Sequence, residues 1–134
     1  MRPVAIAALL LFCSASFAQT IDLHSVKKIY VGSMGQSDEA ERFKMLLTDE
    51  LGKAGFVTTD DAKSADADLT GALSVRVYSD ESRARVTVVL KTTDGARLWG
   101  GDFEPHFKLG GKDSVKLRAE DVAKALRKDV AKAK

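Results

Sequence analysis

The sequence contains few of the side chains that most often serve as nucleophiles, general bases or metal ligands. It has one cysteine and two histidines, and neither His24 nor His106 belongs to an H-E-x-x-H zinc motif. The phosphate-loop pattern G-x-x-x-x-G-K-[ST] and the nucleophile-elbow pattern G-x-S-x-G are also absent. We therefore expect no enzyme activity, no catalytic residues, no metal site and no cofactor.

Two stretches share only single features with known ligand sites. "GSMG" at 32–35 lies between a predicted strand and a predicted helix, as a phosphate loop would. Acidic residues follow in the first helical turn, however, where they would repel a phosphate. The acidic cluster Asp60, Asp61, Asp66 and Asp68 lacks the D-x-D-x-D-G-x₅-E spacing of a calcium loop. We interpret the first stretch as a backbone turn and the second as a solvated loop.

The sequence also lacks an excess of charge of one sign and long hydrophobic runs. It has 21 basic and 19 acidic residues. A nucleic-acid binder is not expected, because such proteins need a concentrated basic surface. The one uncharged apolar run, Val4 to Phe12, is far shorter than the ~20 residues of a membrane helix. We expect no transmembrane segment in the mature chain.

The N-terminus has the features of a signal peptide. The positively charged Arg2 precedes the apolar run, and small residues, Ser16 and Ala18, stand before the expected cleavage site. We predict cleavage after Ala18, so that residues 1–18 are removed and residues 19–134 form a single domain, periplasmic or secreted. Cys13 would leave with the signal peptide. The alternative, lipidation at Cys13, is disfavoured by the bulky Phe12 before it.

The hydrophobic periodicity predicts both helices and strands. A strand over 26–31, a helix over 38–53 and a short strand over 56–59 come first, with Asp38 as the expected helix cap and Gly55 just past the helix end. Strands over 69–77, 84–92 and 96–103 and a helix from about Ser114 follow. The order β-α-β-β-β-β-α predicts an α/β (α+β) two-layer sandwich, a mixed sheet with an antiparallel meander and two helices on one face.

The last hairpin decides which way Trp99 faces. A two-residue type I′ turn at Asp94-Gly95 would place Trp99 opposite Leu90 in the core. A three-residue loop with a bulge would shift the register by one, so that Leu98 points inward and Trp99 lies on the open face. The Asp-Gly pair favours the first arrangement.

If Trp99 points inward, the face that the helices leave uncovered mixes apolar and basic side chains. Such a mixture is typical of protein interfaces, and a free sheet edge offers a second way to accept a partner. We therefore expect an exported accessory protein of the bacterial envelope, a non-catalytic interaction module whose partners are envelope proteins. The candidate partner-binding residues are Tyr78, Val89, Leu98, Arg76, Arg85 and Lys91.

The basic residues of the last helix leave an alternative open. We interpret Lys116, Arg118, Lys124, Arg127, Lys128 and Lys132 as a solvated polar face. The alternative is weak contact with an anionic envelope polymer, or binding of a small ligand. An enzyme with an unrecognised site ranks below both, because no motif supports it.

Three segments together resemble a group of bacterial envelope domains. They are "LTDELGKAGFVTTDD" at 47–61, "ADADLTGALSV" at 65–75 and "VTVVLKTTDGARLWGGDF" at 86–103. Over about residues 30–130 the chain is similar to the amino-terminal domain of TolB, to the curli secretion lipoprotein CsgG and to the penicillin-binding-protein activator LpoB. The resemblance implies a periplasmic, non-enzymatic accessory that docks onto other envelope proteins. The chain lacks TolB's propeller and CsgG's membrane-spanning hairpins, so pore formation and membrane tethering are not implied.

Overall fold

The two-layer α/β fold expected from the sequence is present in the computed structural model, which describes residues 22–79, 82–104 and 113–133. The predicted signal peptide lies outside these residues, and so do residues 80–81 and 105–112. The elements are η2 (Leu23–Ser25), β1 (Lys28–Val31), α2 (Asp38–Lys53), β2 (Val57–Thr59), η3 (Ala62–Ser64), β3 (Ala67–Val77), β4 (Ser82–Lys91), β5 (Arg97–Phe103) and α3 (Ser114–Lys132).

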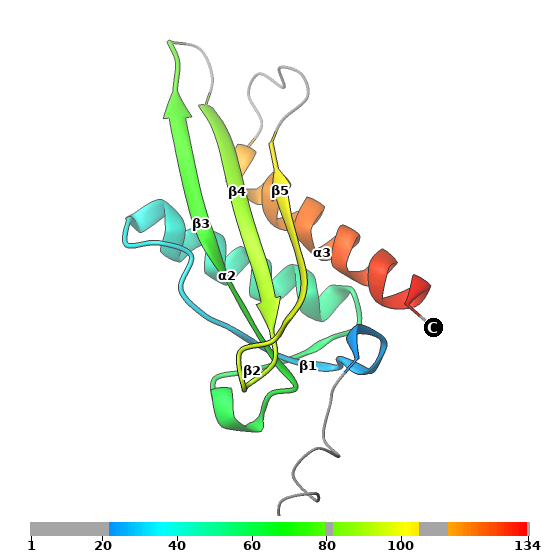
Figure 1. The fold of residues 1–134 in the computed structure, drawn as a ribbon. Helices are drawn as coiled ribbons and strands as arrows, with labels where there is room; N and C mark the ends of the chain where they lie inside the picture. Colours follow the sequence, from blue (N-terminus) through cyan, green and yellow to red (C-terminus); the bar gives the residue numbers. More distant parts are fainter. Residues whose placement is uncertain (1–21, 80–81, 105–112, 134) are drawn as a thin grey trace, which may run out of the picture.

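The five strands form one mixed sheet in the order β2-β1-β3-β4-β5. β1 runs parallel to both β2 and β3, whereas β3, β4 and β5 form the expected antiparallel meander. Both helices lie on the same side of the sheet (Figure 1). The other side of the three long strands is therefore left without a helix layer.

The core lies between the sheet and the helices. On β4 every second side chain, from Ala84 to Leu90, is buried, because strand side chains alternate between the two faces. The helices contribute stripes at helical spacing, and Phe43 of α2 and Leu126 of α3 are fully buried. Val77 at the end of β3 is 81% exposed, because the β3–β4 hairpin reaches beyond the helix layer (Figure 1).

The ends of α2 follow local capping rules, with one correction to the sequence prediction. Ser37, not Asp38, is the N-cap, and its hydroxyl oxygen accepts a hydrogen bond from the Ala40 N–H at 3.1 Å. A short side chain one residue before the helix reaches that free N–H, while Asp38 already lies in the first turn. Gly55 ends the helix with φ of 102°, as predicted, and the Phe56 N–H closes the turn on Leu51 O at 3.0 Å.

An ion pair joins the two helices. Arg42 of α2 donates from Nη1 to Oδ1 of Asp113 at 3.3 Å and also from Nη2 to Oδ2. Asp113 is the N-cap of α3 and accepts from the Lys116 N–H. The hydrogen bond from Arg42 holds the pKa of Asp113 below its usual value. The carboxylate thus caps α3 and connects it to α2.

The last hairpin places Trp99 inward, as predicted, but its turn is not the predicted one. Trp99 pairs with Leu90 and is 9% exposed. Its indole Nε1–H donates to Asp129 Oδ2 of α3 at 2.7 Å. The prediction of a type I′ turn is wrong, because that turn needs positive φ at both central residues and only Gly95 has it.

Two irregularities cancel one another in this hairpin. The Thr92 N–H bonds to Ala96 O and the Gly95 N–H to Thr92 O, so the loop has three residues and would shift the register by one. A β-bulge between Arg97 and Trp99 adds one residue, Leu98, to β5 and shifts the register back. The burial of Trp99 therefore depends on the bulge and not on the turn alone.

Candidate functional site on the open face of the sheet

The side chains of β3, β4 and β5 that point away from the helices form the surface that we call the open face. They alternate with the buried residues along each strand and face one another across the ladders. On β3 and β4 the facing pairs are Asp68 with Lys91, Thr70 with Val89, Ala72 with Thr87, Ser74 with Arg85, and Arg76 with Arg83. The open face is thus polar and built largely of short side chains, with arginines at the hairpin end.

The six candidate contact residues do not share one environment. Arg76, Arg85 and Lys91 are exposed on the open face, and Val89 is half-buried there between β3 and β5. Tyr78, just past the end of β3, is 42% exposed. Leu98, the bulge residue, is half-buried and packs against the core cluster. The surface therefore presents less apolar area than the sequence alone suggested.

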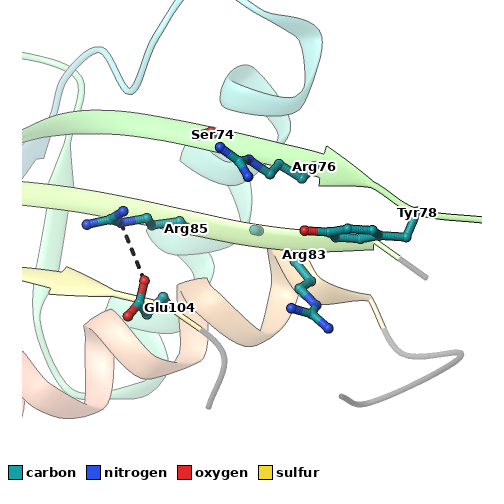
Figure 2. Close-up of a pocket in the computed structure, with 7 residues that line it drawn as sticks. Ser74, Arg76, Tyr78, Arg83, Arg85 and Glu104 are labelled. Atoms are coloured by element: carbon teal, nitrogen blue, oxygen red, sulfur yellow. Dashed lines mark ion pairs between the residues drawn. The ribbon is translucent and has the colours of Figure 1, made fainter. Parts of the chain in front are cut away.

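The arginines of β3 and β4 line a hollow at the hairpin end of the open face. This arginine hollow has a volume of about 280 Å³ and lies between the end of β3 and the start of β4. In Figure 2 the aromatic ring of Tyr78 lies across β4 beside Arg83. The guanidinium Cζ of Arg83 is 4.9 Å from the centre of that ring. The lining residues are Ser74, Arg76, Tyr78, Arg83, Ala84, Arg85 and Glu104.

Arg85 is held by two carboxylates of the β5 side. Its Nε donates to Asp102 Oδ1 at 3.1 Å and its Nη2 donates to Oδ2 at 2.5 Å, while Glu104 Oε2 lies 3.7 Å from Nε (Figure 2). The hydrogen bond from Arg85 lowers the pKa of Asp102. A second hydrogen bond comes from the Thr87 hydroxyl at 3.1 Å. Arg85 therefore has two acidic partners on the β5 side.

Four residues that line the arginine hollow were not among the sequence candidates: Ser74, Arg83, Ala84 and Glu104. Arg83 and Arg85 stand two positions apart in "SRARV", which puts both on one strand face, so Arg83 was detectable. Glu104 follows the last residue of β5, and only the observed strand pairing brings it to Arg85. That contact joins residues far apart in the sequence and leaves no local pattern.

The last helix departs from the sequence interpretation at one position. Arg118 is buried, at 5% exposure, whereas we expected it on the solvated face. It lies three and four positions from Val115 and Val122 and so shares their inward side of α3. Its Nη2 pairs with Asp121 Oδ2 at 3.2 Å. The other basic residues, Lys116, Lys124, Arg127, Lys128 and Lys132, are exposed.

Other candidate chemistry gains no geometric support. His24 is exposed in η2, and His106 lies outside the described residues. In the part of the chain that the structure describes, no three histidine, cysteine or acidic side chains are grouped as metal ligands. Within the same ranges, no helix combines the length and apolar character that crossing a membrane requires.

Solved structures from bacteria share this architecture. PelC from Paraburkholderia phytofirmans, solved as a dodecamer, is 20% identical, and the match covers 81% of this chain and 91% of PelC with a TM-score of 0.55. This chain shares its fold with PelC. A variant of that protein, also a dodecamer, is 18% identical over 81% of this chain and 88% of its own, with a TM-score of 0.54. No protein-family model and no curated protein matches the chain.

A weaker likeness is to a DUF4136 family protein from Bacteroides thetaiotaomicron. It is 9% identical, and the match covers 84% of this chain and 91% of that one with a TM-score of 0.47. At 20% identity the likeness to PelC establishes the fold alone. The α/β fold predicted from the order of the elements is present, while the resemblance to TolB, CsgG and LpoB stays a prediction.

Proposed function

We propose that the protein is an exported accessory of the bacterial envelope that docks onto other proteins and catalyses no reaction. The fold shared with PelC supports a bacterial envelope role, and the signal-peptide features of residues 1–18 support export. The scarcity of nucleophiles and paired histidines in the sequence supports a role without catalysis. The observation that carries the docking role is the open face itself.

The open face is a broad surface that the protein's own helices do not cover. Both helices pack on the opposite side (Figure 1). Exposed or half-buried side chains run along the open face of three adjacent strands. Because the solved PelC structures are dodecamers, the first occupant to test is a second copy of this chain. Envelope proteins of other kinds are the next.

The test places charges at the centre of the open face. Ala72 and Val89 lie on neighbouring strands, Ala72 exposed and Val89 half-buried. Ala72→Glu combined with Val89→Glu should leave the fold intact, because both side chains point away from the helices. Leu98 is unsuitable, since it packs against the core and its substitution would also affect folding. The matched control is Met45→Glu, at a residue 74% exposed on α2.

Self-association is measured by native mass spectrometry. Docking in the periplasm is measured with a photo-crosslinking residue at position 87, and the same residue at position 45 is the control. We expect the double variant to abolish higher assemblies and crosslinks from position 87, and the Met45→Glu variant to retain both. If the double variant folds and keeps every assembly and crosslink, the open face is not the docking surface. If it unfolds while the control does not, the face is part of the core.

A further inference from the structure

The C-terminal half of α3 carries a row of exposed cations. Lys124, Lys128 and Lys132 stand four positions apart, so their side chains lie along one side of the helix. Arg127 is exposed beside them. At a rise of ~1.5 Å per residue, the three lysines extend over about 12 Å of the helix. We call these four residues the basic row.

The carboxylates of the same helix do not neutralise the basic row. Asp121 pairs through Oδ2 with Nη2 of Arg118 at 3.2 Å. Asp129 accepts the indole N–H of Trp99 at 2.7 Å. Glu120 stands one turn before the row, yet within the described residues the row forms no ion pair with it or with any other carboxylate. The positive charge of the row is therefore open to an external anion.

The helix dipole explains only the end of the basic row. Cations stabilise the C-terminus of a helix within its last turn, and Lys132 is the basic residue of the last turn of α3. The three cations before it lie outside that turn. Like charges four positions apart on a helix repel one another and lower its stability. A polyanion bound along the row would relieve this repulsion.

The neighbouring helix restricts the shape of that anion. α2 runs beside α3 in the same direction, because Arg42 pairs with Asp113 at the start of α3 and Lys53 shares a groove with Lys124 further along. Exposed acidic side chains on α2 are Asp38, Glu41 and Asp49. A flat anionic membrane would meet both helices and be repelled by α2. A narrow, linear polyanion can lie along α3 alone.

We propose that the basic row binds an acidic polysaccharide, which lies along α3 with its carboxylates against the lysines and Arg127. Lysine ammonium groups are mobile point charges, so they can follow a flexible chain of carboxylates. An acidic peptide fits less well, because extended peptides bind through a free sheet edge and helical ones through an apolar groove. The basic row is a charged helix surface and offers neither.

This inference goes beyond the proposed docking function and does not depend on it. The helices and the open face are on opposite sides of the sheet, so one molecule can bind polymer on one side and protein on the other (Figure 1). Docking is tested on the open face with crosslinks to proteins. Polysaccharide binding is tested on α3 with the purified, full exported chain and defined saccharides. Failure of one leaves the other standing.

The probes are hexagalacturonate, its fully methyl-esterified form and a hexaglutamate peptide, each titrated by calorimetry. We expect hexagalacturonate to bind and the uncharged ester to bind at least about tenfold more weakly. The affinity for hexagalacturonate should also fall about tenfold or more between about 50 mM and about 200 mM salt, because binding to a polyanion releases its counterions.

Paired substitutions place the binding on α3. Lys124→Gln combined with Lys128→Gln should weaken hexagalacturonate binding by about tenfold, since two charge contacts are lost. The matched control is Lys63→Gln combined with Lys91→Gln, which removes the same charge from exposed positions on η3 and β4. It should leave the affinity unchanged. In thermal melts the α3 pair should keep or raise the melting temperature, because the substitutions remove like-charge repulsion.

Three results would overturn the proposal: hexagalacturonate does not bind, its ester binds equally well, or the control pair loses as much affinity as the α3 pair. Equal or tighter binding of hexaglutamate would instead identify an acidic-peptide site. Binding to phosphatidylglycerol vesicles without binding of hexagalacturonate would identify a membrane-facing surface.

Discussion

The burial of Trp99 predicts a large and specific loss of stability in the Trp99→Ala variant. Large aromatic side chains bury about 150–250 Å². At ~25 cal/mol per Å² this corresponds to an upper bound of roughly 4–6 kcal/mol. Measured truncations of buried tryptophan or phenylalanine cost about 3–5 kcal/mol. Because Trp99 is 9% exposed, we expect the free energy of unfolding to fall by about 3–5 kcal/mol.

The hydrogen bond to Asp129 is separated from the packing by a second variant. Trp99→Phe keeps a large ring but removes the Nε1–H donor, whose partner Asp129 Oδ2 lies 2.7 Å away. Asp129 is only half-buried, so water can replace the lost donor. We expect Trp99→Phe to cost about 1–2 kcal/mol. Val77→Ala is the control, because Val77 is 81% exposed, and it should change stability by less than about 0.5 kcal/mol.

The assay combines urea unfolding followed by circular dichroism with fluorescence of the unmodified protein. Trp99 is the only tryptophan, so the emission reports this side chain alone. We expect blue-shifted emission that iodide quenches poorly and that shifts to the red in urea. Red-shifted, readily quenched emission together with a loss below about 1 kcal/mol in Trp99→Ala would refute the inward register.

Three further predictions concern acid stability, helix ends and processing. The pKa of Asp113 is held low in the folded protein, so its carboxylate is protonated more readily in the unfolded chain, and the stability that it contributes is lost as pH falls below about 4. Asp113→Asn still caps the helix, so in urea unfolding at neutral and acidic pH its free energy of unfolding should fall less on acidification than that of the unmodified protein. Gly52→Ala, at a helical position with open space, should gain about 0.5–1 kcal/mol, whereas Gly55→Ala, at φ of 102°, should lose about 1–2 kcal/mol; thermal melts that shift in the same direction would contradict this. The intact mass of the periplasmic protein should match a chain that starts at Gln19, and a diacylated chain starting at Cys13 would contradict it.

The sequence by itself determined the two helices, the five strands and their order. The bounds of α2 and the start of α3 match the prediction, because helical periodicity and capping residues act within a few positions of the chain. Gly55 was identifiable as the helix end for the same local reason. The apolar residues of β4 alternate with polar ones in the sequence, and the buried side chains of the strand follow the same alternation.

Tertiary structure decided the features that join distant residues. The bulge at Leu98 is an irregularity of strand pairing, and its effect is to keep Trp99 under α3, where its indole reaches Asp129. Arg118 is buried because its position on α3 faces inward, although its charge suggested exposure. The arginine hollow exists only because β3, β4 and the end of β5 lie side by side. Each of these contacts joins segments that are far apart in the sequence, and no local pattern in the chain shows which segments will be neighbours in the fold.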